Sequence, residues 1–309
     1  MRVRRFDGRA MGSALHLTVI GGSQRESVAA RDAAWAEMAA ADAELSRFRT
    51  DSALSRANAM AGSGQWFDAP PRLRRMLTAA HRAHLVSEGR FDPRVIGVLE
   101  AIGEAGGVIL PQATASEGPW MERTGRTSHI RLAAPVDSGG IGKGLGLRWA
   151  LAAAMAAAPR VAGLLLEAGG DVVAAGSGPD GGPWSIGVED PRQPGQLLAV
   201  VALRAGAVAT SSTAFRSWTH EGRPVHHLID PSSAEPADTG LTAVTVATSD
   251  PAWAEVWTKA LFLAGRAGIG DEARRRGLAA WWVEDDGSLH LSPVARVRTT
   301  WTRDEAPAA

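Results

Sequence analysis

The sequence contains no cysteine and no tyrosine, although it contains 11 tryptophans. Without cysteine the chain cannot form disulfides, use a thiolate nucleophile or hold zinc through sulfur ligands. The same absence carries no information about the redox state of the compartment in which the protein works. These three classes of site are therefore excluded.

The sequence also lacks an excess of charge of either sign. Lys and Arg together number 33, and Asp and Glu together number 33, so the formal net charge at pH 7 is zero. A neutral chain has no global field that would recruit nucleic acid or an anionic membrane surface. We therefore expect no nucleic-acid partner.

Long apolar runs are absent as well. The longest apolar helical segment, WALAAAMAAA at residues 149–158, is too short to span a bilayer. The first 22 residues are basic but lack the apolar core of a signal peptide. These features predict no membrane insertion and a cytoplasmic location.

The rest of the composition is that of an ordinary globular chain, with 309 residues, 45% hydrophobic and 21% charged. Apolar residues recur at helical spacing in residues 27–48, 70–87, 141–157 and 251–267, and stretches such as ALHLTVI, VAGLLLEAGGDVVAAG and LAAWWVEDDGSLHLSP predict strands and hairpins. Helices and strands do not alternate strictly, which favours an α+β fold. We predict one domain over residues 1–309, with an irregular insertion at 104–126 and a frayed tail at 303–309.

The segment VDSGGIGKGLG, residues 136–146, contains five glycines, one Asp and one Lys. A Walker A loop fails here because Asp137 stands where its first Gly belongs and Gly144 follows Lys143 where Ser or Thr belongs. A Rossmann pattern fails from Gly140 and from Gly142 alike. The segment still combines backbone N–H groups, the start of a helix and a Lys, which together can bind an anion. Close packing of a helix on a sheet explains the same glycines.

Three further motifs gather polar groups. EAGGD places a glycine pair beside Asp171, and VATSSTAF gathers four hydroxyls at residues 210–213. HHLIDP places His226, His227 and Asp230 on one short expected strand and its exit. Neighbouring strand residues face opposite sides, so only one of the two histidines can enter a given site. A structural, hydrogen-bonded histidine remains an alternative for each.

The order of the motifs resembles the ApbE family of FAD:protein FMN transferases. The matching segments run in order along residues 11–265: MGSALHLTV, ELSRFRTDSALSRAN, FDPRVIGVLEAIG, VDSGGIGKGLG, LLLEAGGDVVAAG, AVATSS, HHLIDPSSAEPADTGLTAVTV and AEVWTKALFLAG. Each motif alone is weak, and their succession is specific. The resemblance implies an ApbE-like, duplicated T-fold-like α+β architecture with mixed sheets and packed helices.

The resemblance also implies a chemistry. The family splits the pyrophosphate of FAD and transfers FMN to a Thr or Ser hydroxyl of a target flavoprotein, releasing AMP, with Mg²⁺ as the usual cation. FAD would be the substrate, and the backbone N–H groups of residues 139–144 would cradle its phosphates. The alternatives are an FAD pyrophosphatase, in which water replaces the acceptor hydroxyl, and an FAD-binding protein with weak or no transfer activity.

Site residues follow from the resemblance by position. His227 is the candidate general base for the attacking hydroxyl, and the carbonyl of Gly140 is a candidate metal ligand. Phe48 would stack on adenine, with a plain core position as its alternative. The remaining residues expected to contact FAD are Met11, Arg90, Phe91, Asp92, Asp137, Lys143, Leu228 and Ile229.

The sequence departs from the family where the metal helix is expected. The family usually carries Asp and, four residues on, Thr, whereas this chain carries Glu255 and Lys259. A carboxylate can ligate Mg²⁺ but an ammonium cannot. The neighbouring Thr258, a further candidate metal ligand, points about 100° away on an ideal helix. Three readings remain open: a Glu–Lys ion pair, a built-in positive charge that weakens the need for metal, or lost activity with retained FAD binding.

Overall fold

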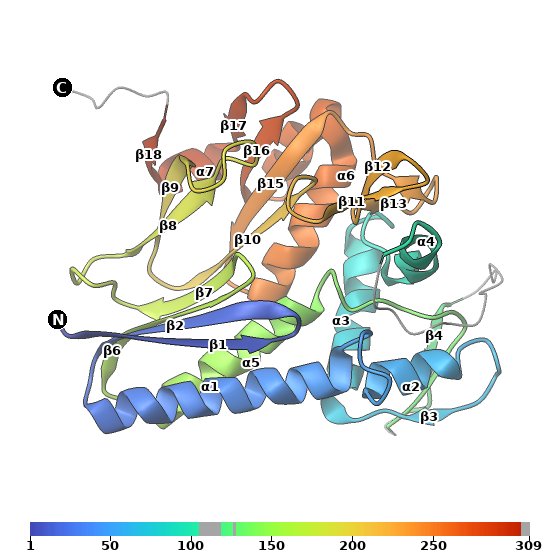
Figure 1. Cartoon of the computed structure of the whole chain (residues 1–309), viewed down its shortest axis with the longest axis horizontal. Coiled ribbons are helices and arrows are strands. Elements are labelled where there is room, and N and C mark those ends of the chain that lie inside the picture. Colours follow the sequence, from blue (N-terminus) through green and yellow to red (C-terminus); the bar gives the residue numbers. More distant parts are fainter. Residues whose placement is uncertain (105–118, 126–127, 304–309) are drawn as a thin grey trace.

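The computed structural model describes residues 1–104, 119–125 and 128–303. Its centre is an eight-stranded sheet with the order β1-β2-β6-β7-β10-β15-β16-β17 (Figure 1). Each neighbouring pair in this sheet is antiparallel. Its strands are β1 (Val3–Ala10), β2 (Ser13–Gly21), β6 (Val161–Ala168), β7 (Asp171–Gly176), β10 (Gly206–Ser212), β15 (Leu241–Thr248), β16 (Ala279–Glu284) and β17 (Leu289–Leu291).

Three long helices pack on one face of this sheet: α1 (Gln24–Leu45), α5 (Gly142–Ala157) and α6 (Pro251–Arg275). Ser23 and Glu26 form a capping box that starts α1, and Asp250 caps α6 with Pro251 at its first position. Strand and helix side chains such as Leu17, Ala34 and Leu147 share one buried core. This core holds the N-terminal halves of α5 and α6 beside the start of β7 and the end of β10, which contribute to the site described below.

The other face of the sheet is covered by a three-stranded sheet, β18-β9-β8. Its strands are β8 (Trp184–Glu189), β9 (Leu197–Leu203) and β18 (Thr299–Thr302), and α7 (Pro293–Arg298) lies beside them (Figure 1). Side chains of β8 alternate between buried and exposed, as expected for a strand with one face on a core. Trp184 and Ile186 pack with Trp281 of the main sheet.

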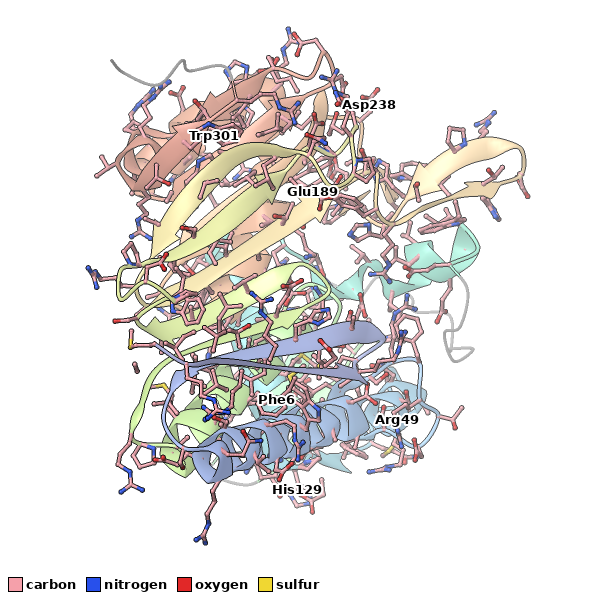
Figure 2. The ribbon with its side chains drawn as sticks, turned by 60° about the vertical axis from the view of Figure 1, so that its left-hand side comes forward. Phe6, Arg49, His129, Glu189, Asp238 and Trp301 are labelled. Carbon is pink, nitrogen blue, oxygen red and sulfur yellow. The ribbon has the colours of Figure 1, made fainter. Side chains whose placement is uncertain are left out.

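Shorter elements build a second region beside α6. They are α2 (Ala53–Ala59), α3 (Pro71–Val86), the 3-10 helix η1 (Pro93–Val95), α4 (Ile96–Ala101), β3 (Phe67–Asp68), β4 (Met121–Arg123) and β5 (His129–Leu132). The hairpin of β11 (Ser217–His220) and β12 (Arg223–His226) projects from the body at the right of Figure 2. Its Trp218 donates a hydrogen bond from Nε1 to the carbonyl of Ile102, at 2.7 Å, which ties the hairpin to the end of α4.

The α+β class predicted from the sequence is confirmed. The helices expected at residues 27–48, 70–87 and 141–157 are present with small shifts of their ends, and so are the hairpins β6–β7 and β16–β17. The last helix was predicted to end at 267 but continues to Arg275 across a kink at Gly265, where φ is 69°. The chain resumes a helix after the kink, because only that single residue leaves the helical region.

Three expectations differ from the structure. The strand expected over HHLIDP is interrupted at residues 227 and 228, between β12 and β13 (Ile229–Asp230); β13 pairs with β14 (Glu235–Pro236). The insertion expected at 104–126 includes β4, while residues 105–118 and 126 lie outside the described residues. The tail expected to fray from 303 is anchored at Arg303, which pairs with Asp190 at 2.8 Å; residues 304–309 lie outside the described part.

Candidate active site

The glycine-rich segment is a rigid turn at the start of α5. The amide side chain of Asn58 clamps Val136, donating to its carbonyl at 2.8 Å and accepting from its N–H at 3.0 Å. The hydroxyl of Ser138 donates to the carbonyl of Leu45 at 2.7 Å. These contacts hold the turn between the end of α1 and the region of α2.

Two of the glycines are required by close approach to other elements. A Cβ on Gly144 would lie 2.5 Å from the Cα of Ala252 and from the carbonyl oxygen of Pro251, so α5 and α6 meet there backbone to backbone. A Cβ on Gly140 would lie 2.6 Å from the Phe91 ring and 3.2 Å from Cδ of Lys259. Close packing therefore accounts for these two glycines.

Several backbone N–H groups of the turn are already engaged. Those of Ile141 and Gly142 both donate to the carbonyl of Ser138, at 3.0 and 2.7 Å. That of Gly144 donates to Oε2 of Glu255 at 2.9 Å. Because each of these three amides is satisfied within the protein, the structure does not support the expectation that they are among the amides of residues 139–144 that cradle phosphates. An anion at this turn must depend more on side chains.

Lys143 extends from the first turn of α5 to Asp171, at the start of β7. The two form an ion pair, and the backbone N–H of Thr210 donates to the same carboxylate at 3.3 Å. Burial disfavours the charged lysine, but Asp171 and Glu255 outweigh it and raise the pKa of the Lys143 ammonium. Lys143 is therefore cationic, with its charge largely balanced by Asp171.

A second set of charges lies on the other side of the turn. Asp137 is buried, and its Oδ1 lies 3.3 Å from Nε of Arg47. Arg47 also pairs with Glu104, and Glu104 pairs with Arg216 from the turn between β10 and β11. One buried carboxylate thus holds two arginines that are far apart in the sequence.

Glu255 and Lys259 lie one helical turn apart on α6. Oε2 of Glu255 accepts the Gly144 N–H, and its other carboxylate oxygen is buried without a hydrogen-bond partner among the described residues. Nζ of Lys259 lies 3.5 Å from the carbonyl oxygen of Glu255 and 3.5 Å from Oγ of Ser211. Burial raises the pKa of the Glu255 carboxyl and lowers the pKa of the Lys259 ammonium. No ion pair forms between these two side chains.

Thr258 is fully buried beside them and turned away from the site. Its hydroxyl donates to the carbonyl of Glu255 at 2.8 Å and forms a 2.7 Å hydrogen bond with the hydroxyl of Ser211. The helical geometry predicted this direction. The structure leaves Thr258 committed to these two partners, which does not support it as a metal ligand.

His227 directly follows the β11–β12 hairpin. Its Nδ1 lies 3.3 Å from the carbonyl oxygen of Arg216, a contact that assigns the ring proton to Nδ1 and leaves Nε2 as the acceptor. Burial, with Arg216 and Lys259 nearby, holds the pKa of His227 well below 6.5. The imidazole is therefore neutral at pH 7, as a general base must be.

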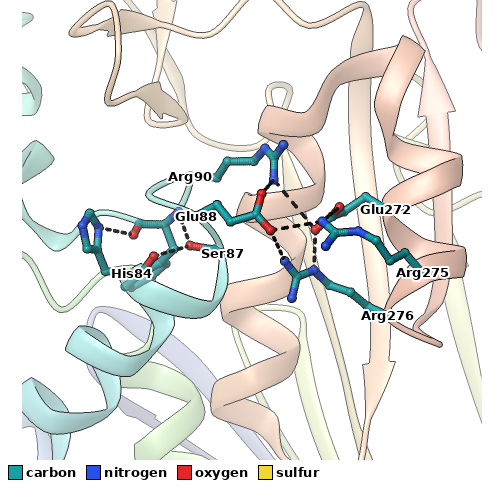
Figure 3. A network of polar contacts seen from close by, with 8 residues as sticks. His84, Ser87, Glu88, Arg90, Glu272, Arg275 and Arg276 are labelled. Carbon is teal, nitrogen blue, oxygen red and sulfur yellow. Dashed lines mark hydrogen bonds and ion pairs between the residues drawn. The ribbon is translucent and has the colours of Figure 1, made fainter.

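Arg90 and Asp92 are held by contacts outside the site. The Arg90 guanidinium lies 3.8 Å from carboxylate oxygens of Glu88 and Glu272, in a network that joins the end of α3 to the end of α6 (Figure 3). Asp92 binds Arg94 through its side chain and caps η1 by accepting from the Arg94 N–H at 2.8 Å. Both residues shape the wall of the site, and Asp92 acts there through the turn that it holds.

Two adjoining cavities collect the predicted residues. The larger has a volume of about 850 Å³, and both are lined by Asp137, Gly139, Arg216, His227 and Lys259. Thr258 is the one predicted site residue that lines neither cavity. The others divide between the larger cavity (Met11, Phe48, Lys143, Glu255), the smaller (Arg90, Phe91, Asp92, Gly140, Leu228, Ile229) and both (Asp137, His227, Lys259).

Some lining residues were missed by the reasoning from sequence. Arg47 and Arg216 belong to this group, although Arg47 directly precedes the predicted Phe48. Glu104, which pairs with both arginines from behind the lining, was missed as well. The Phe48 ring is 49% exposed at the rim, with the Arg47 guanidinium 4.3 Å from its centroid. Its exposure removes the alternative that Phe48 is a plain core residue.

Comparisons with known proteins agree with this geometry. A family model described as the ApbE family matches residues 11–282. The chain belongs to the ApbE family. A relative from Rhodobacter capsulatus, named FAD:protein FMN transferase, is 31% identical over 271 residues, which cover 82% of this chain and 50% of the relative. The chain thus spans half the length of that relative.

Other ApbE relatives match over most of both lengths. A Klebsiella pneumoniae protein, also named FAD:protein FMN transferase, is 24% identical over 91% of this chain and 84% of its own length. The crystal structure of an ApbE protein from Thermotoga maritima superposes with a TM-score of 0.86 at 24% identity, covering 97% of this chain and 100% of the other. The apo flavinyl transferase ApbE of Pseudomonas stutzeri gives 0.81 at 25% identity, over 96% of each chain. These likenesses establish the ApbE fold.

Proposed function

We propose that this ApbE-family chain transfers FMN from FAD to a Thr or Ser hydroxyl of a target flavoprotein and releases AMP. The observation that carries the proposal is that a neutral imidazole, His227, and two ammonium groups, those of Lys143 and Lys259, line the same cavity. Phosphoryl transfer needs this pairing of a proton acceptor with fixed positive charge. The names of the relatives support the same activity.

The residues divide the reaction between them. The acceptor hydroxyl oxygen attacks the phosphorus of the FMN half, the bond from that phosphorus to the bridging oxygen breaks, and AMP leaves with the bridging oxygen. The proton of the hydroxyl passes to Nε2 of His227. Lys143 and Lys259 face the negative charge of the pyrophosphate. Phe91, Leu228 and Ile229 supply the apolar wall expected for the flavin ring, and Phe48 the surface expected for adenine.

Magnesium, the cation expected from the resemblance, does not fit the residues present. Within the described residues, no three His, Cys, Asp or Glu side chains gather as a metal site. The carbon chain of Lys259 lies against Gly140, whose carbonyl was the expected ligand. The Lys259 ammonium, which has no lone pair to coordinate a metal, lies between the Glu255 carbonyl and the Ser211 hydroxyl. We therefore derive no step through a metal ion.

The predictions about the membrane and about the compartment have different outcomes. No helix in the described parts of the chain is long and apolar enough to cross a bilayer. The cytoplasmic location stays a prediction.

The test is to incubate the protein with FAD and an acceptor domain that carries one exposed Thr. AMP and a flavin-labelled acceptor should appear together, and neither should appear with an acceptor whose Thr is replaced by Val. AMP at an equal rate without acceptor would instead show an FAD pyrophosphatase. FAD that stays bound and intact in every mixture would show a flavin-binding protein without transfer activity.

A further inference from the structure

Lysine is almost absent from this protein. Lys143 and Lys259 are the only lysines in the 309-residue sequence, and the other residues that carry a permanent positive charge are arginines. Both lysines line the larger cavity. A lysine ammonium is a compact point charge with three donors, whereas an arginine presents a broad planar fork. The chain thus has arginine elsewhere and places its two lysines, the more compact cations, in the lining of this cavity.

The two ammonium groups are not equivalent. Lys143 forms an ion pair with Asp171, so its charge is already balanced. Lys259 forms no ion pair within the described residues, and its two polar contacts, with Ser211 and with the Glu255 carbonyl, are both long at 3.5 Å. The other cation shared by the two cavities, Arg216, is bound to Glu104. Of the two cations shared by the cavities, Lys259 is therefore the one that no carboxylate binds directly within the described residues.

The position of Lys259 is fixed by packing. Its Cδ and Cε lie 3.2 and 3.4 Å from the place where a Cβ on Gly140 would be, so the aliphatic chain runs along the glycine-rich turn. The ammonium at its end lies beside Ser211 and faces both cavities. A divalent cation in the same place would be repelled by the ammonium.

We propose that the Lys259 ammonium is the built-in cation of the pyrophosphate site, so that FAD binding and FMN transfer need no divalent metal. The inference rests on the proposed function, because it names the group that neutralises the pyrophosphate in that reaction. Of the three roles that the sequence left open for Lys259, this inference selects the built-in positive charge. Lys259 is then neither a simple ion-pair partner of Glu255 nor a sign of lost activity.

The first test uses the unaltered protein. FAD affinity, from quenching of flavin fluorescence, and the rate of AMP release with acceptor are measured in EDTA and in excess Mg²⁺. We expect each quantity to agree between the two buffers within about twofold, well under the tenfold that a lost charge contact would cost. Loss of FAD binding or of AMP release in EDTA, restored by Mg²⁺, would overturn the inference while leaving the transferase intact.

Variants then locate the charge. Lys259→Met keeps the length of the side chain without its charge, and we expect FAD affinity in EDTA to fall by at least about tenfold. Lys259→Thr opens the space beside Glu255, and we expect its FAD affinity and transfer to become dependent on Mg²⁺. Arg274→Met, which removes an exposed charge on the same helix, is the matched control and should bind FAD as the unaltered protein does.

The outcomes separate the two claims. FAD bound equally in both buffers, but without AMP, would overturn the transfer and match the alternative of lost activity with retained FAD binding, leaving Lys259 as a cation for FAD binding alone. Lys259→Met binding FAD as tightly as Arg274→Met would overturn the inference alone. Failure of FAD to bind in either buffer would overturn both.

Discussion

The backbone N–H of Gly144 donates to the carboxylate of Glu255 at 2.9 Å, across the interface of α5 and α6. The contact is possible because Gly144 has no side chain, so the two helices approach to backbone distance at Ala252. Together with this close approach, the hydrogen bond holds the helix that carries Lys143 against the helix that carries Lys259. The glycine-rich segment is therefore both a packing device and a part of the site, and the two explanations weighed from the sequence are complementary.

Replacing Gly144 by Ala tests this packing. Its Cβ would lie 2.5 Å from backbone atoms of α6, and overpacking of this kind costs about 1–3 kcal/mol of unfolding free energy. We expect lower stability in urea titrations and weaker FAD binding, because α6 must move away. Gly97→Ala in α4 is the control, since nothing lies within 4 Å of its added Cβ. Equal behaviour of the two variants would show that the helices can separate without cost.

Glu104→Gln tests the buried carboxylate that holds Arg47 and Arg216. The side chains of Glu104 and Arg47 are only 7% and 3% exposed, and breaking a buried ion pair from one side costs about 3–5 kcal/mol. We expect the free energy of unfolding to fall by about 3 kcal/mol, the lower end of this range, because the amide oxygen of the introduced glutamine still accepts one hydrogen bond. The measurement is chemical denaturation, with the exposed Glu221→Gln in the β11–β12 turn as control. A change below about 1 kcal/mol, the size expected of a surface pair, would contradict the buried network.

Phe48→Ala tests the proposed adenine surface. The ring is exposed at the rim of the larger cavity and is held by the Arg47 guanidinium. Stacking of a base on an aromatic ring is worth about 1–3 kcal/mol, so FAD affinity should fall by about 5- to 150-fold. FMN lacks the adenine, and its affinity should change little. Equal weakening of FAD and FMN would place the ring on the flavin half instead.

Sequence reasoning named many of the residues that line the two cavities because the order of the motifs resembles the ApbE family, although each motif alone is weak. The start of α5 follows from the glycine-rich turn, and the direction of Thr258 follows from helical spacing alone. The Arg47–Glu104–Arg216 network could not be predicted, because its members are far apart in sequence and meet only through tertiary packing. Strand β1 was missed since it is an edge strand with one exposed face and little hydrophobic signal. The different states of the two lysines depend on Asp171, which a strand of the central sheet contributes.

His227 gives a prediction about pH. Its pKa is held well below 6.5 by burial and by the neighbouring Arg216 and Lys259, so the neutral, proton-accepting form persists as the pH falls through 6.5. Below its own pKa the imidazole is protonated and can no longer accept the proton of the attacking hydroxyl. The FMN-transfer rate, measured with saturating FAD from about pH 5 to pH 8, should therefore stay flat near 6.5 and fall only at lower pH. His227→Asn should slow transfer by about 10²–10⁴-fold, abolish the acid limb and leave FAD affinity unchanged. A midpoint at or above 6.5 in the unaltered protein, or an acid limb that survives in His227→Asn, would assign the proton to another group.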